Sequence, residues 1–518
     1  MLQRAGGKSR TSRFARVFGT VSLGVAASLT GLAQAPPPGT VAAPAPSYGN
    51  AGAGASITLT PTGGQQAPGT APGVTTQGPF QGSVPTGQAT GTVIPITLKE
   101  ALDRSLKYNL GIIENNQSTR AAHAQRLRNL NALLPNLYGQ VQQNVQQVNL
   151  QALGLRLNTI NIPGFHIPTI QGPFPVQDIR AYLTLNVFNW SDIQNLRSAS
   201  QSETASKLSY RSDRDTVVLV TATAYLQVVA DVANVESNQA QVRTNQAIYD
   251  RNVDQNKQGV IANIDVLRSK VQLQTQQQQL IAVQNQLAID KLTLARIVGL
   301  PNGQEFELTE KVPYAELTGI TLDQALKQAY ATRPDYQSAK AQLRAAELAY
   351  QAAAAENYPS LAINGNYGDI GSPNFGRSHG TFFVAGTLTV PLFLGSQVRA
   401  DKLQADTVLQ DRKAQLANLG GNIDDQVRTA FLNLHSSAEL VAVAQSNIDL
   451  ASQTLIQSQD RFAAGVTNNL EVVEAQQAVA TANQSYIASL YSYNAAKISL
   501  AQAIGVAEQS GLEYLGVK

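Results

Sequence analysis

The sequence TLKEAL at residues 97–102 recurs as TLDQAL at residues 321–326, 224 positions further along the chain. A second motif, LAxxxG, occurs at residues 294–299 and again at 500–505, with an offset of 206. A long repeat with one change of offset indicates a duplicated structural unit that differs in the length of one internal segment. The sequence therefore predicts two similar repeats and a short tail, at residues 96–310, 311–505 and 506–518.

Each repeat is predicted to open with a helix, over residues 98–133 in the first copy and 322–357 in the second. Thr97 and Thr321 precede these helices at the N-cap position, where a hydroxyl accepts a hydrogen bond from a backbone N–H. Glu100 has the spacing of a capping box. Each opening helix is expected to end near a proline.

Two strands are predicted to follow the opening helix of each repeat. Apolar and polar residues alternate over 137–147 and 181–188 in the first copy, and over 361–367 and 382–390 in the second. One face of each strand is therefore apolar, and the other carries Asn, Thr and Gln side chains.

The connection between the paired strands explains the change of offset. Pro135 to Phe188 spans 53 residues, but Pro359 to Phe393 spans only 34. Insertions are tolerated in solvent-exposed loops. We therefore place the longer connection, with its Pro173 and Pro175, in an exposed turn.

Long helices are predicted beyond the strands. Residues 191–258 contain no Gly or Pro, which allows a single helix of about 100 Å. The segment 260–298 has a seven-residue apolar repeat, and its counterpart in the second copy keeps the same frame, which indicates left-handed coiled-coil packing. The helix predicted at 396–464 contains Gly420-Gly421, where we expect a kink or a break. The heptad positions are Val266, Leu273, Leu280, Leu287 and Leu294 in the first copy and Val472, Val479, Tyr486, Tyr493 and Leu500 in the second.

The N-terminus has the pattern of an export signal. Five basic residues precede an apolar stretch, and Ala33-Gln34-Ala35 resembles a cleavage site. Removal of residues 1–35 leaves 33 of the 38 basic residues against 35 acidic ones, so the mature chain has a charge of −2 and shows no sign of nucleic-acid binding. Residues 36–95 are rich in Pro, Gly and Thr and carry no charge, which predicts a disordered linker.

The number of strands limits the possible architectures. Four strands cannot close a barrel, which needs about eight even when it is filled by side chains. Several chains that each contribute strands to one barrel would place the apolar faces against lipid and the polar faces around a wet lumen. Three chains would supply twelve strands. We expect no membrane-spanning helix after removal of the signal, and we expect the long helices to extend the barrel as a conduit.

The duplicated order of opening helix, strand pair and heptad helix pair resembles the outer-membrane efflux proteins of the TolC type over residues 96–505. The resemblance implies a mainly α fold with a small β part: a trimeric β-barrel in the bacterial outer membrane, continued by an α-helical tunnel into the periplasm. It also implies a passive exit duct for small molecules or secreted polypeptides. The implied partners are two further copies of the chain, a periplasmic adaptor, an inner-membrane transporter that supplies the energy, and outer-membrane lipid.

The glycine-containing turns between the paired long helices are candidate docking sites. In the resembling family these turns form the periplasmic tip that meets the adaptor, which assigns that role here to Gly259, Val260, Gly465 and Val466. A purely structural interpretation stays open, because Gly259 and Gly465 also suit a tight turn in the left-handed region.

Acidic residues just beyond the turns are candidate aperture residues. The resemblance assigns rings that narrow the tunnel mouth and select ions to Glu471 and Glu474, and a closing network to Asp265. A ring of carboxylates in a narrow aqueous mouth concentrates cations. Acids in the first turn of a helix are also favoured by the helix dipole alone. Thr467 stands where closed family members can have an arginine, so Arg461 is the candidate for closing the mouth.

Enzymatic motifs and cofactor sites are not found in the sequence. Cysteine is absent, and His123, His166, His379 and His435 have no metal-ligand spacing. We therefore expect a protein that is not an enzyme and needs no cofactor. The alternative to a conduit is a coiled-coil spacer or adhesin at the cell surface, which would need neither the alternating strands nor the acids beside the turns.

Overall fold

A computed structural model of the chain describes residues 79–149, 152, 169–310, 315–317, 319–372, 377–464, 466–467 and 469–516. These residues all belong to one compact unit, Gly63–Lys518. The predicted signal peptide, the linker up to residue 78, and Gly465 lie outside the described residues.

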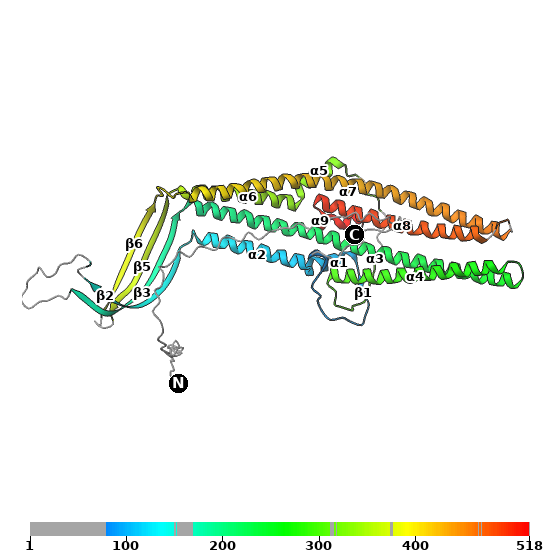
Figure 1. Cartoon of the computed structure of the whole chain (residues 1–518), viewed down its shortest axis with the longest axis horizontal. Helices are drawn as coiled ribbons and strands as arrows, with labels where there is room; N and C mark the ends of the chain where they lie inside the picture. The colour runs from blue at the N-terminus through cyan, green and yellow to red at the C-terminus, as the bar shows by residue number, and fades with distance from the viewer. Residues whose placement is uncertain are drawn as a thin grey trace, which may run out of the picture. The chain divides into compact units, whose positions relative to one another are not determined.

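The two repeats share the order of two short helices, two strands and two long helices, and the first also has β1 and β4 (Figure 1). The first comprises β1 (Ile94–Ile96), α1 (Leu98–Tyr108), α2 (Leu110–Asn131), β2 (Asn136–Asn149), β3 (Ile170–Phe188), α3 (Trp190–Lys257), α4 (Asn263–Val298) and β4 (Phe306–Leu308). The second comprises α5 (Leu322–Thr332), α6 (Pro334–Ala354), β5 (Ser360–Ser372), β6 (Arg377–Thr389), α7 (Gln397–Ala463) and α8 (Asn469–Ile504), and α9 (Ala507–Leu515) follows. Two 3₁₀ turns, η1 (Pro79–Gln81) and η3 (Ala355–Asn357), complete the described elements.

The strand pairs of the two repeats join in one antiparallel sheet of order β2-β3-β5-β6. In the described part of the chain, the outer edges of β2 and β6 pair with no further strand. Strand β3 is longer than predicted, because Pro173 and Pro175 lie within it rather than in the turn. They are tolerated there because β5 begins to pair with β3 only at Gln177, so the proline positions have a partner strand on one side alone.

The opening helix of each repeat is divided in two, which corrects the prediction of continuous helices. Asn109 separates α1 from α2 in an extended conformation; its side chain accepts from Gly111 N and donates to the Phe80 carbonyl at 2.7 Å. Arg333 separates α5 from α6 because Pro334 excludes the helical conformation from the residue before it. The threonine caps are confirmed: Thr97 accepts from Glu100 N, and Thr321 forms a full capping box with Gln324.

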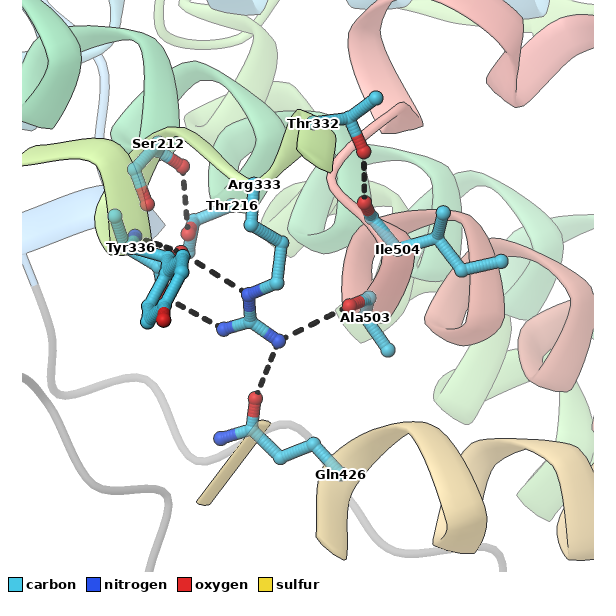
Figure 2. Close-up of polar contacts among 9 residues, drawn as sticks. Ser212, Thr216, Thr332, Arg333, Tyr336, Gln426, Ala503 and Ile504 are labelled. Atoms are coloured by element: carbon cyan, nitrogen blue, oxygen red, sulfur yellow. Dashed lines mark hydrogen bonds and ion pairs between the residues drawn. The ribbon is translucent and has the colours of Figure 1, made fainter. Parts of the chain in front are cut away.

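The buried Arg333 side chain connects three segments of the second repeat (Figure 2). Its guanidinium donates to Gln426 on α7 at 2.8 Å and to the Ala503 carbonyl near the end of α8 at 3.0 Å. Two further hydrogen bonds, of 3.0 and 2.6 Å, bind it to Asp335. Thr332 donates to the Ile504 carbonyl at 2.7 Å. These bonds hold the α5–α6 break against the C-terminal end of α8.

The long helices form two antiparallel pairs. α3 runs without interruption for 68 residues and α7 for 67. The break expected at Gly420-Gly421 is absent, and the Gly420 carbonyl accepts an additional hydrogen bond of 2.9 Å from Tyr330. The predicted heptad positions are buried or partly buried, with Leu273, Leu294, Val472, Tyr493 and Leu500 nearly inaccessible. The repeated LAxxxG motif ends α4 and α8, with Gly299 and Gly505 both at positive φ.

The core is centred on α3. By length and composition alone, α3 contains a window that is apolar enough to cross a membrane. Half of that window is buried within the protein. Val218, Ala222, Tyr225 and Val228 of α3 pack against residues of α1, α4 and α8 in the core. The apolar window is therefore explained by helix packing.

The end of the predicted linker is ordered, which corrects the boundary at residue 95. Residues 79–95 include η1 and β1, and β1 pairs in parallel with β4 of the same repeat. Gln304 holds this segment through its side-chain amide: its oxygen accepts from Thr90 N at 2.7 Å, and its nitrogen donates to the Thr92 carbonyl at 2.8 Å. Composition missed this contact because the partner residues lie more than 200 positions away.

A buried carboxyl group between α3 and α4 predicts a pH dependence of stability. Burial, followed by the neighbouring Asp290, raises the pKa of Asp231 to about 7, and Gln227 donates to it at 3.0 Å. The Asp231 carboxyl is therefore protonated in the folded protein below pH 7. Its stabilising contribution is complete below the unfolded pKa of about 4 and is lost as the pH rises through 7.

We predict that Asp231→Asn will stabilise the protein at pH 8, by roughly 1–3 kcal/mol, and will have little effect at pH 4. The reason is that the amide keeps the hydrogen-bonding shape without the buried charge. Thermal unfolding from pH 4 to 8 measures the effect, with the exposed Asp254→Asn as the control. An equal shift in melting temperature at both pH values would contradict the assignment.

Candidate functional site

The turns that connect α3 to α4 and α7 to α8 lie at the helix ends remote from the sheet (Figure 1). Each turn joins the two antiparallel helices of one coiled-coil pair, so its backbone must reverse direction within a few residues. The candidate residues Val260, Asp265, Val466, Glu471 and Glu474 are all within or just beyond these turns.

The first turn is closed by a Schellman motif. Gly259 adopts φ +72° and donates to the Asn256 carbonyl at 2.9 Å, and Val260 N donates to the Gln255 carbonyl at 2.9 Å. Asn256 then donates from its side chain to the Ile261 carbonyl at 2.8 Å. This geometry supports the structural role predicted for Gly259, because a left-handed residue at this position favours glycine.

The second turn contains the same backbone hydrogen bond between residues five positions apart as the first turn. Val466 N donates to the Arg461 carbonyl at 2.9 Å, which matches the bond between Val260 and Gln255. The valines are equivalent in exposure as well: 67% of Val260 and 70% of Val466 is accessible. Ile264 and Leu470 are also exposed beside them. Each turn therefore presents an apolar surface at its end.

Asp265 lies in the first turn of α4. Its carboxylate forms an ion pair with Arg268 at 3.4 Å, one helical turn further along. The aspartate is partly buried, whereas the arginine is half exposed. Within the described residues this pairing is local to α4. The closing network that the resemblance implied for Asp265 stays a prediction.

Glu471 lies at the centre of a polar cluster that connects α7 with α8. Its carboxylate receives a short hydrogen bond from Thr467 and one of 3.5 Å from Ser458, and it forms an ion pair with Arg461 at 3.4 Å. Arg461, the candidate for closing the mouth, thus contacts Glu471, and so does Thr467. The closing role of Arg461 stays a prediction. Glu474, one turn further along α8, is exposed and is not brought into this cluster.

Ser458 was not predicted from the sequence. It is buried on α7 and faces the carboxylate of Glu471. The predicted hairpin could have indicated that Ser458 lies near Glu471, because Ser458 lies seven residues before Gly465 and Glu471 six residues after it. Residues at similar distances on the two sides of the turn of an antiparallel pair lie near one another. No group of three or more His, Asp or Glu side chains in the described ranges could hold a metal ion.

Comparisons with known proteins agree with this architecture. The family model described as outer membrane efflux protein matches residues 178–300 and 325–506. The outer membrane protein TolC of Escherichia coli is 23% identical over 348 residues, which is 64% of this chain and 69% of TolC. The alkaline protease secretion protein AprF of Pseudomonas aeruginosa is 23% identical over 338 residues, with the same coverage of both chains.

Solved structures share the fold as well. A membrane protein from Pseudomonas aeruginosa aligns with a TM-score of 0.68 at 16% identity, over 82% of this chain and 98% of that one. This likeness confirms the predicted fold class, a mainly helical protein with a small sheet at one end of long paired helices. The family model covers more than half of the chain: it matches the C-terminal part of β3, strands β5 and β6, the four long helices and both turns. The chain therefore belongs to the outer membrane efflux protein family and is of the TolC type.

Proposed function

We propose that this chain is the outer-membrane exit duct of a tripartite export system. Three copies would close one barrel from their four-stranded sheets and continue it as a helical tunnel. The duct is passive, and a transporter in the inner membrane would supply the energy. The relatives' names include the secretion of an alkaline protease by AprF, so polypeptides are among the classes of cargo that this chain could carry.

The two faces of the sheet carry this proposal. Leu137, Leu183 and Val384 lie on one face, together with other apolar side chains. The opposite face carries an ion pair between Asp178 and Arg180, and Arg180 also donates to Asn366 at 3.3 Å. A charged pair in the middle of a membrane strand must face water, because its transfer into lipid costs several kcal/mol. The sheet is thus suited to a wall between lipid and a wet lumen.

The open sheet edges favour an assembly of several copies. A sheet with edges is not stable in lipid, because every unpaired backbone group there costs several kcal/mol. The edges of β2 and β6 can pair with those of neighbouring copies. Antiparallel closure of three four-stranded sheets gives a twelve-stranded barrel, and α3 and α7 would extend its wall by about 100 Å.

The acids beyond the second turn fit a selective aperture. In a trimer, Glu474 would contribute three exposed carboxylates to one narrow mouth, and Glu471 would contribute three that are held by Arg461 and Thr467. The cluster at Glu471 connects α8 to α7 and therefore stabilises the arrangement in which these two helices are packed together. The exposed Val260 and Val466 provide the apolar surface against which a periplasmic adaptor would dock.

We predict that Glu471→Ala combined with Glu474→Ala will reduce the preference of the channel for cations, because it removes six carboxylates from the mouth of a trimer. The reversal potential of the purified protein in planar bilayers under a KCl gradient measures this preference. Glu513→Ala, on the exposed side of α9, is the control and should leave the potential unchanged.

Persistent electrical silence from a folded, trimeric wild-type protein would overturn the channel proposal. That result is the one expected of a coiled-coil spacer or adhesin. A conducting channel whose reversal potential does not respond to the double substitution would preserve the duct and reject the assignment of the aperture.

We predict that Arg461→Ala will increase the fraction of time for which the channel is open. The substitution removes the ion pair that connects Glu471 of α8 with α7. Because both side chains are partly exposed, the effect should not exceed about 1 kcal/mol, or roughly fivefold in the ratio of open to closed time. Single-channel recording measures this ratio, and Arg344→Ala, at another exposed pair, should leave it unchanged.

We predict that cysteines at Val260 and Val466 will form cross-links to a periplasmic adaptor expressed in the same cells. Both side chains are exposed at the turns, and the native chain has no cysteine to give a background. Cross-linked products are detected by their mass on a denaturing gel. Cysteine at Leu403, which is exposed near the opposite end of α7, is the control. Equal cross-linking from all three positions would argue against docking at the turns.

A further inference from the structure

One continuous row of residues crosses the polar face of the sheet. Tyr138 on β2 pairs with Tyr182 on β3, Tyr182 pairs with Asn366 on β5, and Asn366 pairs with Phe383 on β6. All four strands thus contribute one residue, and three of the four are aromatic. The strands can be followed side by side in Figure 1.

The aromatic side chains lie on the same face as the Asp178–Arg180 ion pair. Side chains alternate between the faces of a strand, so Tyr182 shares a face with Arg180, two residues before it. The Arg180 guanidinium lies 5.4 Å from the centre of the Tyr182 ring. Because this face is the wet one in the proposed duct, the row would be directed into the lumen.

Two members of the row, on the edge strands β2 and β6, are about half accessible in a single chain. Half of Tyr138 is exposed, and so is 53% of Phe383. The Phe383 ring has no polar atom that water could satisfy, and its neighbours along the strand on this face are Thr381 and Ala385. In the proposed barrel, the edges of β2 and β6 pair with neighbouring copies and the apolar face lies against lipid, but the wet face stays open to the lumen. The Phe383 ring would therefore be available for contact with molecules in the lumen.

The geometry of the tyrosine pair indicates what kind of contact this is. The rings of Tyr138 and Tyr182 are stacked, with centres 5.3 Å apart and an angle of 13° between their planes. Arg180 covers Tyr182 and is itself bound by Asp178 and Asn366, so its charge is already compensated. The accessible surface is therefore aromatic rather than ionic.

We propose that Tyr138, Tyr182 and Phe383 form an aromatic contact belt inside the barrel, which binds transported molecules through their planar aromatic groups. In a trimer the belt holds nine aromatic rings. It supplies weak stacking contacts on the path of the cargo, a role distinct from ion selection at the helix turns. This inference rests on the proposed function, because it requires the polar face to line a lumen.

The test uses block of the conducting trimer in planar bilayers by benzenesulfonate and by cyclohexanesulfonate. The two probes have the same charge and six-membered rings, but only benzenesulfonate has a flat aromatic ring that can stack. Stacking contacts typically correspond to about a two- to tenfold change in affinity. We expect half-block by benzenesulfonate at a concentration lower by that factor than for cyclohexanesulfonate.

Phe383→Leu and Tyr138→Leu should each bring the ratio of the two half-block concentrations close to one. Phe382→Leu is the matched control, because Phe382 is the adjacent residue, is 77% exposed and lies on the opposite, lipid-side face. It should leave the ratio unchanged. A purely structural row would instead alter the heat resistance of the trimer without changing the ratio.

Equal block of the wild-type channel by both probes would overturn the aromatic belt while leaving the duct intact. An identical loss of selectivity in Phe382→Leu would overturn it as well. Absence of current from every folded trimer would overturn the proposed function, and the belt with it.

Discussion

The unpaired outer edges of β2 and β6 are the constraint on which the rest of this structure depends. A four-stranded sheet with one apolar face is satisfied neither in water nor in lipid, because its edges expose backbone donors and acceptors. When several copies close one barrel, the strand edges become paired and the apolar face lies against lipid. Closure also requires the helices of the two repeats to leave the sheet in the same direction, although the strands differ in length: 14 and 19 residues in the first repeat and 13 each in the second.

The helical part is governed by a different balance. α3 and α7 are too long to be buried by the rest of a single chain. Side chains on their exposed faces form hydrogen bonds and ion pairs with other residues of the same helix. Heptad packing joins each long helix to its partner, and the hairpin turn brings residues of the two helices that lie near it into contact. Glu471, Arg461 and Ser458 meet for this reason. The same fold thus places the exposed Glu474 one helical turn from Glu471, which is held by hydrogen bonds and an ion pair.

Much of this arrangement was predictable because periodicity depends on neighbours in the sequence. The strands, the long helices, the heptad frame and the threonine caps all follow from spacing within one element. The interruptions at Asn109 and Arg333 were missed although Pro334 marked the second one. The order of residues 79–95 was also missed, because it depends on Gln304, which lies just before β4 and more than 200 positions away.

The sequence by itself determined the duplication, the class of each element and the two chemically different faces of the strands, since all of these arise from the repeat and from alternation. Only the tertiary structure decided which side chains meet. It placed Tyr138, Tyr182, Asn366 and Phe383 in one row, and it put Arg461 against Glu471. The physical reason is that strand register and helix pairing are determined by packing between segments far apart in the chain, which no local pattern contains.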